Sequence, residues 1–412
     1  MQLKPTGVEV LPSGLTLLAI PQPQAAVVTA DLWVRSGART EPLAYQGVSH
    51  FLEHLIFKGT DQLPPGKFDY LVEARGGVTN AATSMDFTHY YITVAREDLA
   101  DCLPLLADLV CNPAVPATEF DAERLVVLEE IRRSNDNPDR QIYQTLARTL
   151  YGDHPYARPV LGEPENLMAM TADWVRSFHR ARYQPERMNL VLAGGLPTET
   201  LLAIGRETLG AFTGSETVEL PETPRLNPVT TRVEHTLARL QQNRLLIAWM
   251  GPDITHLADS IALEFISTLL TTGRTSTLVR LLREEKGWVR NINSYFSVQH
   301  DPGLFVIGAQ VPGIHLADTE QVIREEVQRL CEEPIPVDQL ERARRLLLSE
   351  FVFGTETPSQ TCALYGYYST VGQLGQVQEY RDLLVSLDEP QIQQVARQYL
   401  GRNPSVLTFL AP

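Results

Sequence analysis

The order of predicted secondary-structure elements repeats on either side of a proline-rich stretch, and this restricts the chain to a duplicated architecture. Periodicity in the first half predicts a strand, two helices, a strand and two further helices, in the ranges 26–34, 47–57, 67–74, 87–95, 99–110 and 116–150. The second half repeats this order at 244–249, 258–270, 278–285, 304–311, 316–330 and 336–353. The repetition lies in element order and not in residue identity. We therefore expect an α+β fold with two homologous domains.

The boundary between these domains falls where the composition changes. Pro221, Pro224 and Pro228 follow a short polar run that contains Gly214 and Ser215, which is typical of a linker. We expect the N-terminal domain at 1–215, the linker at 216–229 and the C-terminal domain at 230–412. A chain of 412 residues agrees with two domains, because a single core rarely extends that far.

Charge and composition exclude several classes of function. A net charge of −15 argues against a nucleic-acid binder and against docking on an anionic membrane. The four cysteines form no CxxC pair, which disfavours a zinc ribbon and is typical of a reducing compartment. The sequence has no apolar leader and no apolar run of membrane-spanning length. We therefore expect a cytoplasmic protein that binds neither nucleic acid nor membranes.

The run His50-Phe51-Leu52-Glu53-His54 has the form HxxEH. On a helix, His50 and His54 lie one turn apart on one face, so both imidazoles can bind the same ion. Glu53 shares this face and can take a proton from water without binding the metal. A chance HxxEH in a chain of this composition is expected only about one or two times in a hundred. A structural histidine pair is the alternative, and we interpret the run as a zinc site.

A catalytic zinc needs a third protein ligand. The predicted helix 116–150 offers Glu123, Glu129 and Glu130. Glu123 and Glu130 are two turns apart and share a face, whereas Glu129 is rotated by about 100° from Glu130. Only one residue of the adjacent pair can face the metal, and we interpret Glu129 as a solvated surface acid.

With these residues, the chain resembles the M16 family of zinc peptidases, in which HxxEH is the zinc motif. The resemblance in the first half extends to His54–Thr60, Gly76–Thr83, Asp86–Tyr91, Tyr151–Tyr156 and Pro159–Gly162. In the second half it is weaker and rests on Gly273–Ser276 and Leu282–Gly287. The resemblance implies two homologous domains, each a mostly antiparallel sheet packed against helices, that form half of a clamshell.

The resemblance also selects the ligands. The family carries its distal glutamate about 75 residues after HxxEH, and 75 residues separate His54 from Glu130. It therefore implies that His50, His54 and Glu130 bind Zn2+, that Glu53 is the general base, and that Glu123, one heptad earlier, supports the ligands from outside the metal's own contacts.

Substrate binding is likewise implied by the resemblance. Short unfolded peptides would pair with the exposed edge of a strand at Thr79–Thr83. This makes Asn80 and Ala81 substrate-binding residues, although an ordinary turn is the alternative for Asn80. Arg283 stands at the position of an arginine that helps hold the substrate carbonyl in relatives.

One position departs from the family pattern. Many relatives carry a tyrosine seven residues after that arginine, and Arg290 stands there in this chain. In heterodimeric relatives the zinc subunit can borrow the Arg–Tyr pair from an inactive partner. The resemblance thus implies that the second domain is an inactive repeat, and that the chain forms a homodimer or a heterodimer with a paralogous M16 subunit. The oxyanion donor is then either Arg283 or a residue of the partner.

Two functions fit these observations. The first is a zinc metalloendopeptidase that hydrolyses short unfolded peptides by metal-activated water, as the catalytic subunit of a dimer. The second is a non-catalytic M16-like scaffold subunit of a heteromeric complex. The intact HxxEH with Glu130 favours the first, because scaffold relatives usually lose these ligands.

Overall fold

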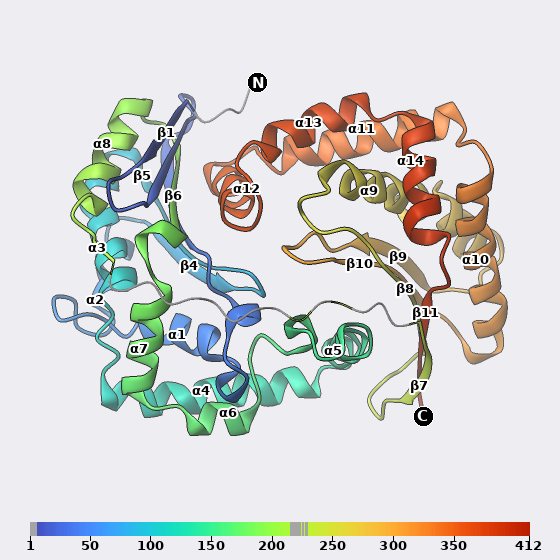
Figure 1. Ribbon diagram of the computed structural model, residues 1–412, viewed down its shortest axis with the longest axis horizontal. Helices are drawn as coiled ribbons and strands as arrows, with labels where there is room; N and C mark the ends of the chain where they lie inside the picture. Colours follow the sequence, from blue (N-terminus) through green and yellow to red (C-terminus); the bar gives the residue numbers. More distant parts are fainter. Residues whose placement is uncertain (1–5, 215–223, 225, 227–229) are drawn as a thin grey trace. The chain divides into compact units, whose positions relative to one another are not determined.

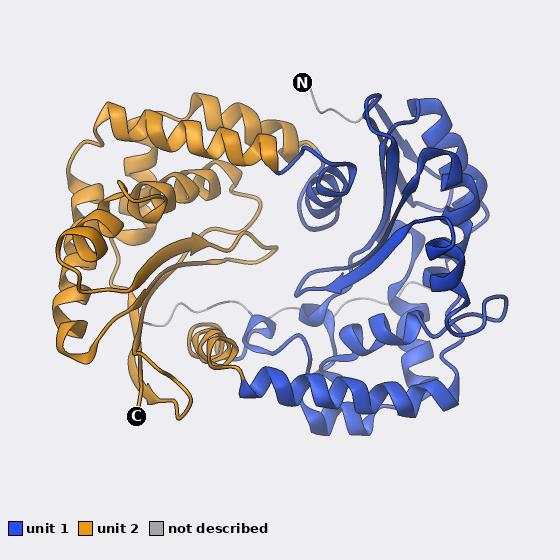
Figure 2. Ribbon diagram, turned by 180° about the vertical axis from the view of Figure 1, so that it is seen from behind, with its two compact units in different colours: residues 1–136, 153–224, 354–374 blue, residues 137–152, 225–353, 375–412 orange. Residues whose placement is uncertain are grey.

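The structure, a computed structural model, describes residues 6–214, 224, 226 and 230–412. They form two compact units (Figures 1 and 2), each built around one sheet. Unit 1 comprises Met1–Asp136, Asp153–Pro224 and Gly354–Leu374, and unit 2 comprises Asn137–Gly152, Arg225–Phe353 and Gly375–Pro412. None of the helices in the described part of the chain has the length and hydropathy of a membrane-spanning segment.

The sheet of unit 1 has the strand order β1-β2-β6-β3-β5-β4, in which only β2 and β6 run parallel. Its strands are β1 (Gly7–Val10), β2 (Thr16–Pro21), β3 (Val27–Val34), β4 (Val78–Thr83), β5 (Thr88–Ala95) and β6 (Met188–Gly194). Burial alternates strictly along β5, because Tyr90, Ile92 and Val94 enter the core beneath the helices while their neighbours face the other side.

The helices of unit 1 that precede residue 210 enclose that core, and Val48–Ile56 among them packs on the edge strand β4. The helices of unit 1 are α1 (Val48–Ile56), α2 (Lys67–Glu73), α3 (Leu99–Cys111), α4 (Ala117–Asp136), α6 (Pro164–Ala169), α7 (Ala172–Arg182), α8 (Thr198–Leu209) and α12 (Pro358–Val371). Helices α3 and α8 pack on β5 and β2, and α1 packs on β4, β5 and α4. The rings of Phe51 and Phe120, with centroids 5.0 Å apart, join α1 to α4.

Unit 2 repeats this topology. Its sheet has the order β7-β11-β8-β10-β9, with only β7 and β11 parallel. The strands are β7 (Arg232–Thr236), β8 (Arg244–Met250), β9 (Asn291–Phe296), β10 (Leu304–Gln310) and β11 (Ser405–Leu410). The helices are α5 (Pro138–Tyr151), α9 (Leu257–Thr271), η6 (Val279–Glu285), α10 (Leu316–Glu332), α11 (Val337–Phe353), α13 (Gln376–Ser386), α14 (Glu389–Val395) and η8 (Ala396–Leu400). The expected duplicated α+β fold with mostly antiparallel sheets is confirmed.

Each unit contains one helix from the other half of the sequence (Figure 2). Helix α12 packs on β3 and β6 of unit 1, where the Cys362 thiol lies 3.5 Å from the carbonyl oxygen of Val191. Helix α5 belongs to unit 2, where the hydroxyl of Tyr151 donates to the carbonyl oxygen of Pro302 at 3.1 Å. The compact units therefore differ from the contiguous ranges 1–215 and 230–412. Of the expected linker 216–229, only residues 224 and 226 are described.

The single helix predicted over 116–150 is wrong, because the structure divides it into α4 and α5 at Asn137. Pro138 cannot donate the hydrogen bond that a continuous helix requires. The side chain of Asn137 caps the second helix by accepting from the backbone of Asp139 and Arg140 at 3.0 and 3.3 Å. The break lets α4 stay in unit 1 while α5 enters unit 2.

Candidate metal centre

Helix α1 is fixed at its N-terminus by a buried carboxylate. The two oxygens of Glu41 accept hydrogen bonds from the backbone N–H groups of Gly47 and Ser49, each at 2.7 Å. Burial raises the pKa of Glu41 to about 7, against the lowering effect of these hydrogen bonds. Gly47 adopts φ 89°, in the left-handed region that glycine enters without strain. These contacts set the direction in which α1 leaves the turn.

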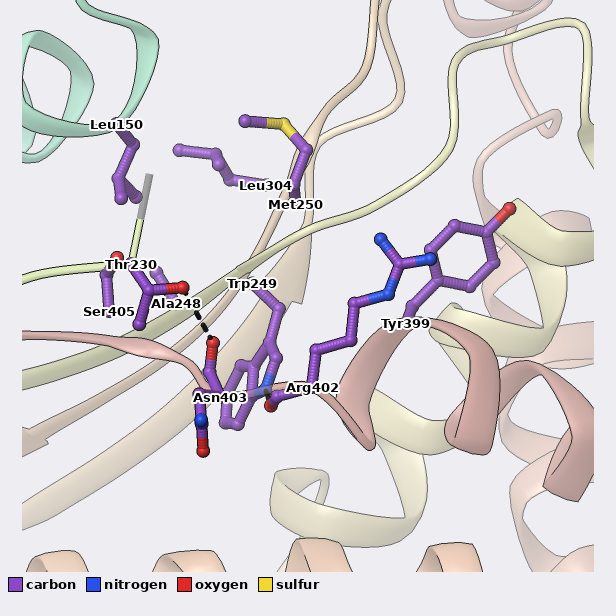
Figure 3. A pocket seen from close by; sticks show the side chains of 10 residues that line it. All are labelled: Leu150, Thr230, Ala248, Trp249, Met250, Leu304, Tyr399, Arg402, Asn403 and Ser405. Carbon is purple, nitrogen blue, oxygen red and sulfur yellow. Dashed lines mark hydrogen bonds between the residues drawn. The ribbon is translucent and has the colours of Figure 1, made fainter. Parts of the chain in front are cut away.

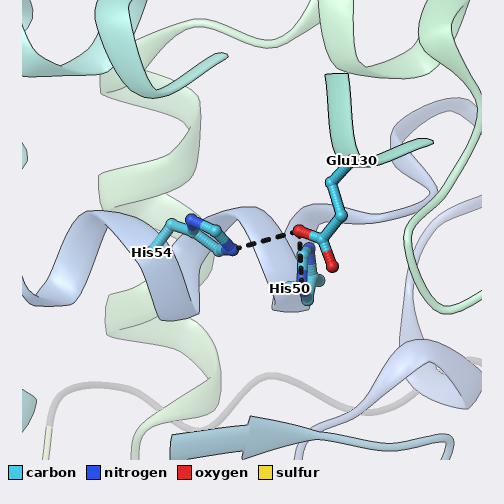
Figure 4. A group of neighbouring side chains, drawn as sticks. All are labelled: His50, His54 and Glu130. Carbon is cyan, nitrogen blue, oxygen red and sulfur yellow. Dashed lines mark ion pairs between the residues drawn. The ribbon is translucent and has the colours of Figure 1, made fainter. Parts of the chain in front are cut away.

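Two imidazoles of α1 and one carboxylate of α4 converge (Figure 4). Nε2 of His50 and Nε2 of His54 lie 3.7 and 3.6 Å from the same oxygen, Oε2 of Glu130. One ligand atom from each of the three side chains can be chosen so that all lie within 4.8 Å of one another. The structure thus brings together the three residues that the sequence nominates as ligands.

These separations fit a shared ion. They exceed the length of an ordinary hydrogen bond. Two ligands that are each about 2.0–2.1 Å from one tetrahedral zinc are separated by about 3.3 Å, close to the spacing seen between the imidazoles and Glu130. Two imidazoles and one carboxylate, with a fourth position left for water, are a donor set of catalytic zinc sites. The residues present therefore fit zinc.

His50 is suited to bind a cation as a neutral ring. Burial, with a smaller contribution from His54, lowers the pKa of His50 to about 3. A neutral imidazole keeps the lone pair that a metal ligand must offer. Its Nδ1 is buried and has no hydrogen-bond partner among the described residues, which is costly for a polar atom. Hydrogen bonding alone therefore does not account for the burial of His50.

The ring of His54 contacts Glu123. Nδ1 of His54 lies 2.9 Å from Oε1 of Glu123, so that Nε2 is left to face Glu130. The other oxygen of Glu123 pairs with the ammonium group of Lys58 at 2.7 Å. Burial opposes ionisation of Glu123, but the hydrogen bonds from Lys58 and His54 outweigh it and hold its pKa below the usual range.

Glu129 faces away from this cluster. Its carboxylate accepts from Arg132 at 2.8 Å and from Arg133 at 3.1 Å on the exposed side of α4. The hydrogen bonds from Arg132 and Arg133 lower the pKa of Glu129 to about 2. Its surroundings match the interpretation of Glu129 as a surface acid.

The side chain of Glu53 extends from α1 to the edge strand β4. The hydroxyl of Thr83, at the end of β4, donates to Oε2 of Glu53. Burial raises the pKa of Glu53, while Thr83 and the nearby histidines His54 and His89 act in the opposite direction. A partly buried carboxylate with one oxygen engaged retains a second oxygen for a proton. The arrangement can therefore perform acid–base chemistry.

Asn80 and Ala81 lie in β4, which pairs only with β5 among the described strands. The other side of β4 is thus a free edge at which an extended peptide can add. The side-chain oxygen of Asn80 accepts from the backbone N–H of Ala81 at 2.9 Å. A peptide that pairs through this N–H must displace the Asn80 carboxamide.

Arg283 belongs to unit 2, at the end of η6. Its guanidinium pairs with the neighbouring carboxylate of Glu284, with Nε and Oε1 2.9 Å apart. Glu284 also binds Arg274 at 2.7 Å. Arg290 directly precedes β9, and its backbone N–H donates to the carbonyl oxygen of Gln310 at 2.9 Å. The guanidinium of Arg283 and the backbone N–H of Arg290 thus both have partners within unit 2.

A pocket in unit 2 is lined by Leu150, Met250 and Leu304 among others (Figure 3). Nε1 of Trp249 donates to the carbonyl oxygen of Arg402 at 3.1 Å. The hydroxyl of Thr230 donates to the carbonyl oxygen of Asn403 at 3.3 Å. In the described part of the chain, only His50, His54 and Glu130 form a metal-binding group of three.

Sequence reasoning missed three residues that support the site, which are Glu41, Lys58 and Thr83. Thr83 and Lys58 lie inside segments that resemble the family, but nothing in their local pattern identifies their partners. Glu41 precedes α1 by too many residues to be recognised as a cap, because a capping side chain normally comes from the residue next to the helix.

Comparisons with known proteins agree with this geometry. Residues 16–164 match the family described as insulinase, peptidase family M16, and residues 169–347 match the peptidase M16 inactive domain. An uncharacterized zinc protease of Streptomyces coelicolor is 29% identical over 411 residues, which cover 98% of this chain and 88% of the relative. An uncharacterized zinc protease of Mycobacterium leprae is 30% identical over 399 residues, which cover 95% of this chain and 89% of the relative.

Solved structures show the same fold. A protease from Helicobacter pylori superposes with a TM-score of 0.91 at 24% identity, and the match covers 98% of this chain and 99% of that chain. Both halves of the present chain are thus accounted for by family matches and by relatives that extend over nearly its whole length. The resemblance seen in the sequence is confirmed, and the chain belongs to peptidase family M16.

Proposed function

We propose that this chain is a zinc metalloendopeptidase that hydrolyses short unfolded peptides, with His50, His54 and Glu130 as the zinc ligands and Glu53 as the general base. The observation that carries the proposal is the approach of both imidazoles to one oxygen of Glu130, at 3.7 and 3.6 Å. The names of the relatives from Streptomyces coelicolor and Mycobacterium leprae, both called zinc proteases, support it. The presence of all three proposed ligands disfavours the alternative of a scaffold subunit.

The roles of the side chains follow from their contacts. Bound zinc supplies a Lewis acid that lowers the pKa of water and polarises a carbonyl group. Glu53 takes the proton of the attacking water on its free oxygen and delivers it to the nitrogen of the leaving amine. Thr83 keeps the other oxygen of Glu53 in place. Glu123 holds the His54 ring by accepting its Nδ1–H.

The free edge of β4 supports a preference for unfolded polypeptides. An extended peptide can donate and accept backbone hydrogen bonds along Thr79–Thr83, while a folded protein has already paired these groups. Thr83 lies at the end of this edge and contacts Glu53. A peptide paired there brings a backbone carbonyl near the proposed base, with Asn80 and Ala81 as contact residues.

We also propose that full activity requires a second M16 chain, as a homodimer or as a heterodimer with a paralogue. Arg290 stands where relatives carry the tyrosine that donates to the substrate carbonyl. A guanidinium is longer than a phenol, always charged, and repelled by a nearby dication. Loss of one such donor typically costs about a hundredfold in rate. Arg290→Tyr should therefore accelerate the lone chain, and a gain of zero would show that another group already acts as the donor.

The deciding experiment for the proposed function measures zinc and cleavage together. The purified chain should contain one zinc per chain and should cleave a quenched basic peptide. Removal of the metal by a chelator should abolish cleavage, and added zinc should restore it. A chain that binds zinc but cleaves no peptide, alone or with a paralogous subunit, would support the scaffold function instead.

A further inference from the structure

A row of side chains crosses the unit 1 sheet to the free edge of β4. The register pairs Trp33 of β3 with His89 of β5, and His89 with Ala82 of β4. Paired residues lie on the same face, so these three side chains stand side by side on the face opposite Tyr90. A peptide residue added opposite Ala82 would be the next member of this row.

His89 is anchored by a buried acid. Its Nδ1 lies 2.9 Å from Oδ1 of Asp31, whose side chain is 2% exposed, while that of His89 is 13% exposed. The two residues are diagonal neighbours on adjacent strands, since Asp31 pairs with Tyr91. An imidazole that donates Nδ1–H to a carboxylate keeps its lone pair on Nε2. Nε2 of His89 has no hydrogen-bond partner within the described residues and is free to accept a donor.

Aromatic packing fixes the plane of this ring. The rings of Trp33 and His89 stack with centroids 4.2 Å apart, and those of His89 and Tyr91 stack at 5.8 Å. Trp33 is held in turn by α12, because Gly366 leaves room for its indole against the helix. The imidazole therefore presents an edge and not a face, and its orientation is set before any ligand arrives.

Distance decides what His89 can reach. A peptide chain on the free edge of β4 would be two interstrand spacings, about 9–10 Å, from the backbone of β5. This separation is too large for contact with the scissile carbonyl group. A long side chain extending over the small Ala82 can close the gap, and Ala82 is exposed. Only side chains such as lysine, arginine and tyrosine combine sufficient length with a donor at the tip.

The charge around His89 favours the cations lysine and arginine over tyrosine. The carboxylate of Asp31 accepts from Nδ1 on the other side of the His89 ring and makes Nε2 a stronger acceptor, and the ring of Tyr91 flanks the imidazole. Hydrogen bonds from a cation are stronger than those from a neutral donor, and aromatic faces attract cations. We propose that His89, held by Asp31, is a specificity-determining residue that binds the side chain of a lysine or arginine in the substrate. This inference rests on the proposed peptidase function.

The position of that substrate residue follows from the register. Ala82 is adjacent to Thr83, which contacts the proposed base Glu53. Successive residues in a strand advance by about 3.3 Å. The recognised cation therefore lies within about one or two residues of the scissile bond.

The test compares arginine with citrulline, its neutral isostere, at each position of one quenched peptide. At one position near the cleaved bond, the zinc-loaded chain should prefer arginine by about tenfold in kcat/KM, mainly through KM. Asp31→Asn and His89→Gln should each reduce that preference to near unity and leave the zinc content unchanged. Asp253→Asn removes a comparable carboxylate from His256, 2.9 Å away on the surface of unit 2, and should keep the preference.

The outcomes separate this inference from the proposed function. Cleavage without an arginine preference, or a preference that survives both variants, would overturn the role of His89. An equal loss of kcat/KM for the arginine and citrulline peptides in Asp31→Asn would assign Asp31 a structural role instead. If the wild-type chain cleaves no peptide, alone or with a paralogous subunit, the proposed function fails, and fluorescence anisotropy of the labelled arginine and citrulline peptides still reports whether the cation is bound through His89.

Discussion

Helix α1 in unit 1 and helix α9 in unit 2 follow equivalent strands of two sheets that share an order of five strands, but they bury different side chains. Helix α1 follows β3 and helix α9 follows β8, and each packs on an edge strand, β4 or β9. Helix α1 carries His50 and His54 beside Glu130. Helix α9 buries apolar side chains such as Ile261 and Phe265. The fold thus requires only the apolar pattern, whereas the site requires polar partners from α1, α4 and β4 together.

The largest expected effect tests whether chemistry is confined to unit 1. Glu53→Gln removes the proton acceptor but keeps the shape of the side chain and the contact with Thr83. The rate of peptide cleavage should fall by about 10²–10⁴-fold, because general base catalysis contributes that much. Zinc content, measured by metal analysis, should remain one per chain. Wild-type turnover by a zinc-loaded variant would exclude Glu53 as the base.

The second-largest expected effect tests which glutamate of α4 binds the metal. Glu130→Gln should weaken zinc binding by about a hundredfold or more, because an amide is a poorer ligand than a carboxylate. Glu129→Gln is the matched control on the adjacent residue, whose carboxylate is engaged by Arg132 and Arg133. Competition with a chelator gives both affinities. If Glu129→Gln were the variant that loses zinc, the assignment of the third ligand would have to change.

A pH-dependent prediction concerns Glu264, a half-buried acid on α9. Burial raises the pKa of Glu264 to about 7, with Tyr380 lowering and Glu350 raising it. Between the ordinary pKa of 4.5 and about 7, the folded state binds more protons than the unfolded state. Stability contributed by unit 2 therefore falls as pH rises through this window, by up to about 3 kcal/mol, and stays level above it.

Glu264→Gln should remove this dependence. Denaturant unfolding at pH 5 and pH 8 should show the variant gaining stability relative to wild type at the higher pH. Glu379→Gln, an exposed acid on α13, serves as the control and should leave the difference between the two pH values unchanged. An equal change in the free energy of unfolding between pH 5 and pH 8 for wild type and Glu264→Gln would show that the carboxyl of Glu264 titrates normally.

The smallest effect probes the helix that unit 1 takes from the second half of the chain. A Cβ atom on Gly366 would lie 2.1 Å from Nε1 of Trp33, so Gly366→Ala forces α12 away from β3. Overpacking of this kind costs about 1–3 kcal/mol, measurable by thermal unfolding. Gly375→Ala meets no atom within 4 Å and should be nearly neutral. Equal melting temperatures for the two variants would contradict the close packing of α12 on Trp33.

Much of the site could be predicted from the sequence because helical periodicity is a local property. The spacing of His50 and His54 places both rings on one face of any helix, whatever surrounds it. Glu130 could be chosen over Glu129 only through the family spacing, since both residues lie on the same predicted helix. The apolar pattern continues on both sides of Asn137 and therefore predicts one helix. Pro138, which cannot continue the hydrogen bonds of a helix, is the residue that indicates the boundary.

The sequence by itself determined the duplicated α+β architecture and the helix that carries HxxEH, because periodicity and turn chemistry act between near neighbours. The tertiary structure alone decided that α5 and α12 cross to the other unit. It also decided that Glu41 caps α1 and that Asp31 anchors His89. These contacts join residues whose separation along the chain follows no period. They arise because buried polar groups and open sheet faces must find partners wherever the folded backbone brings them.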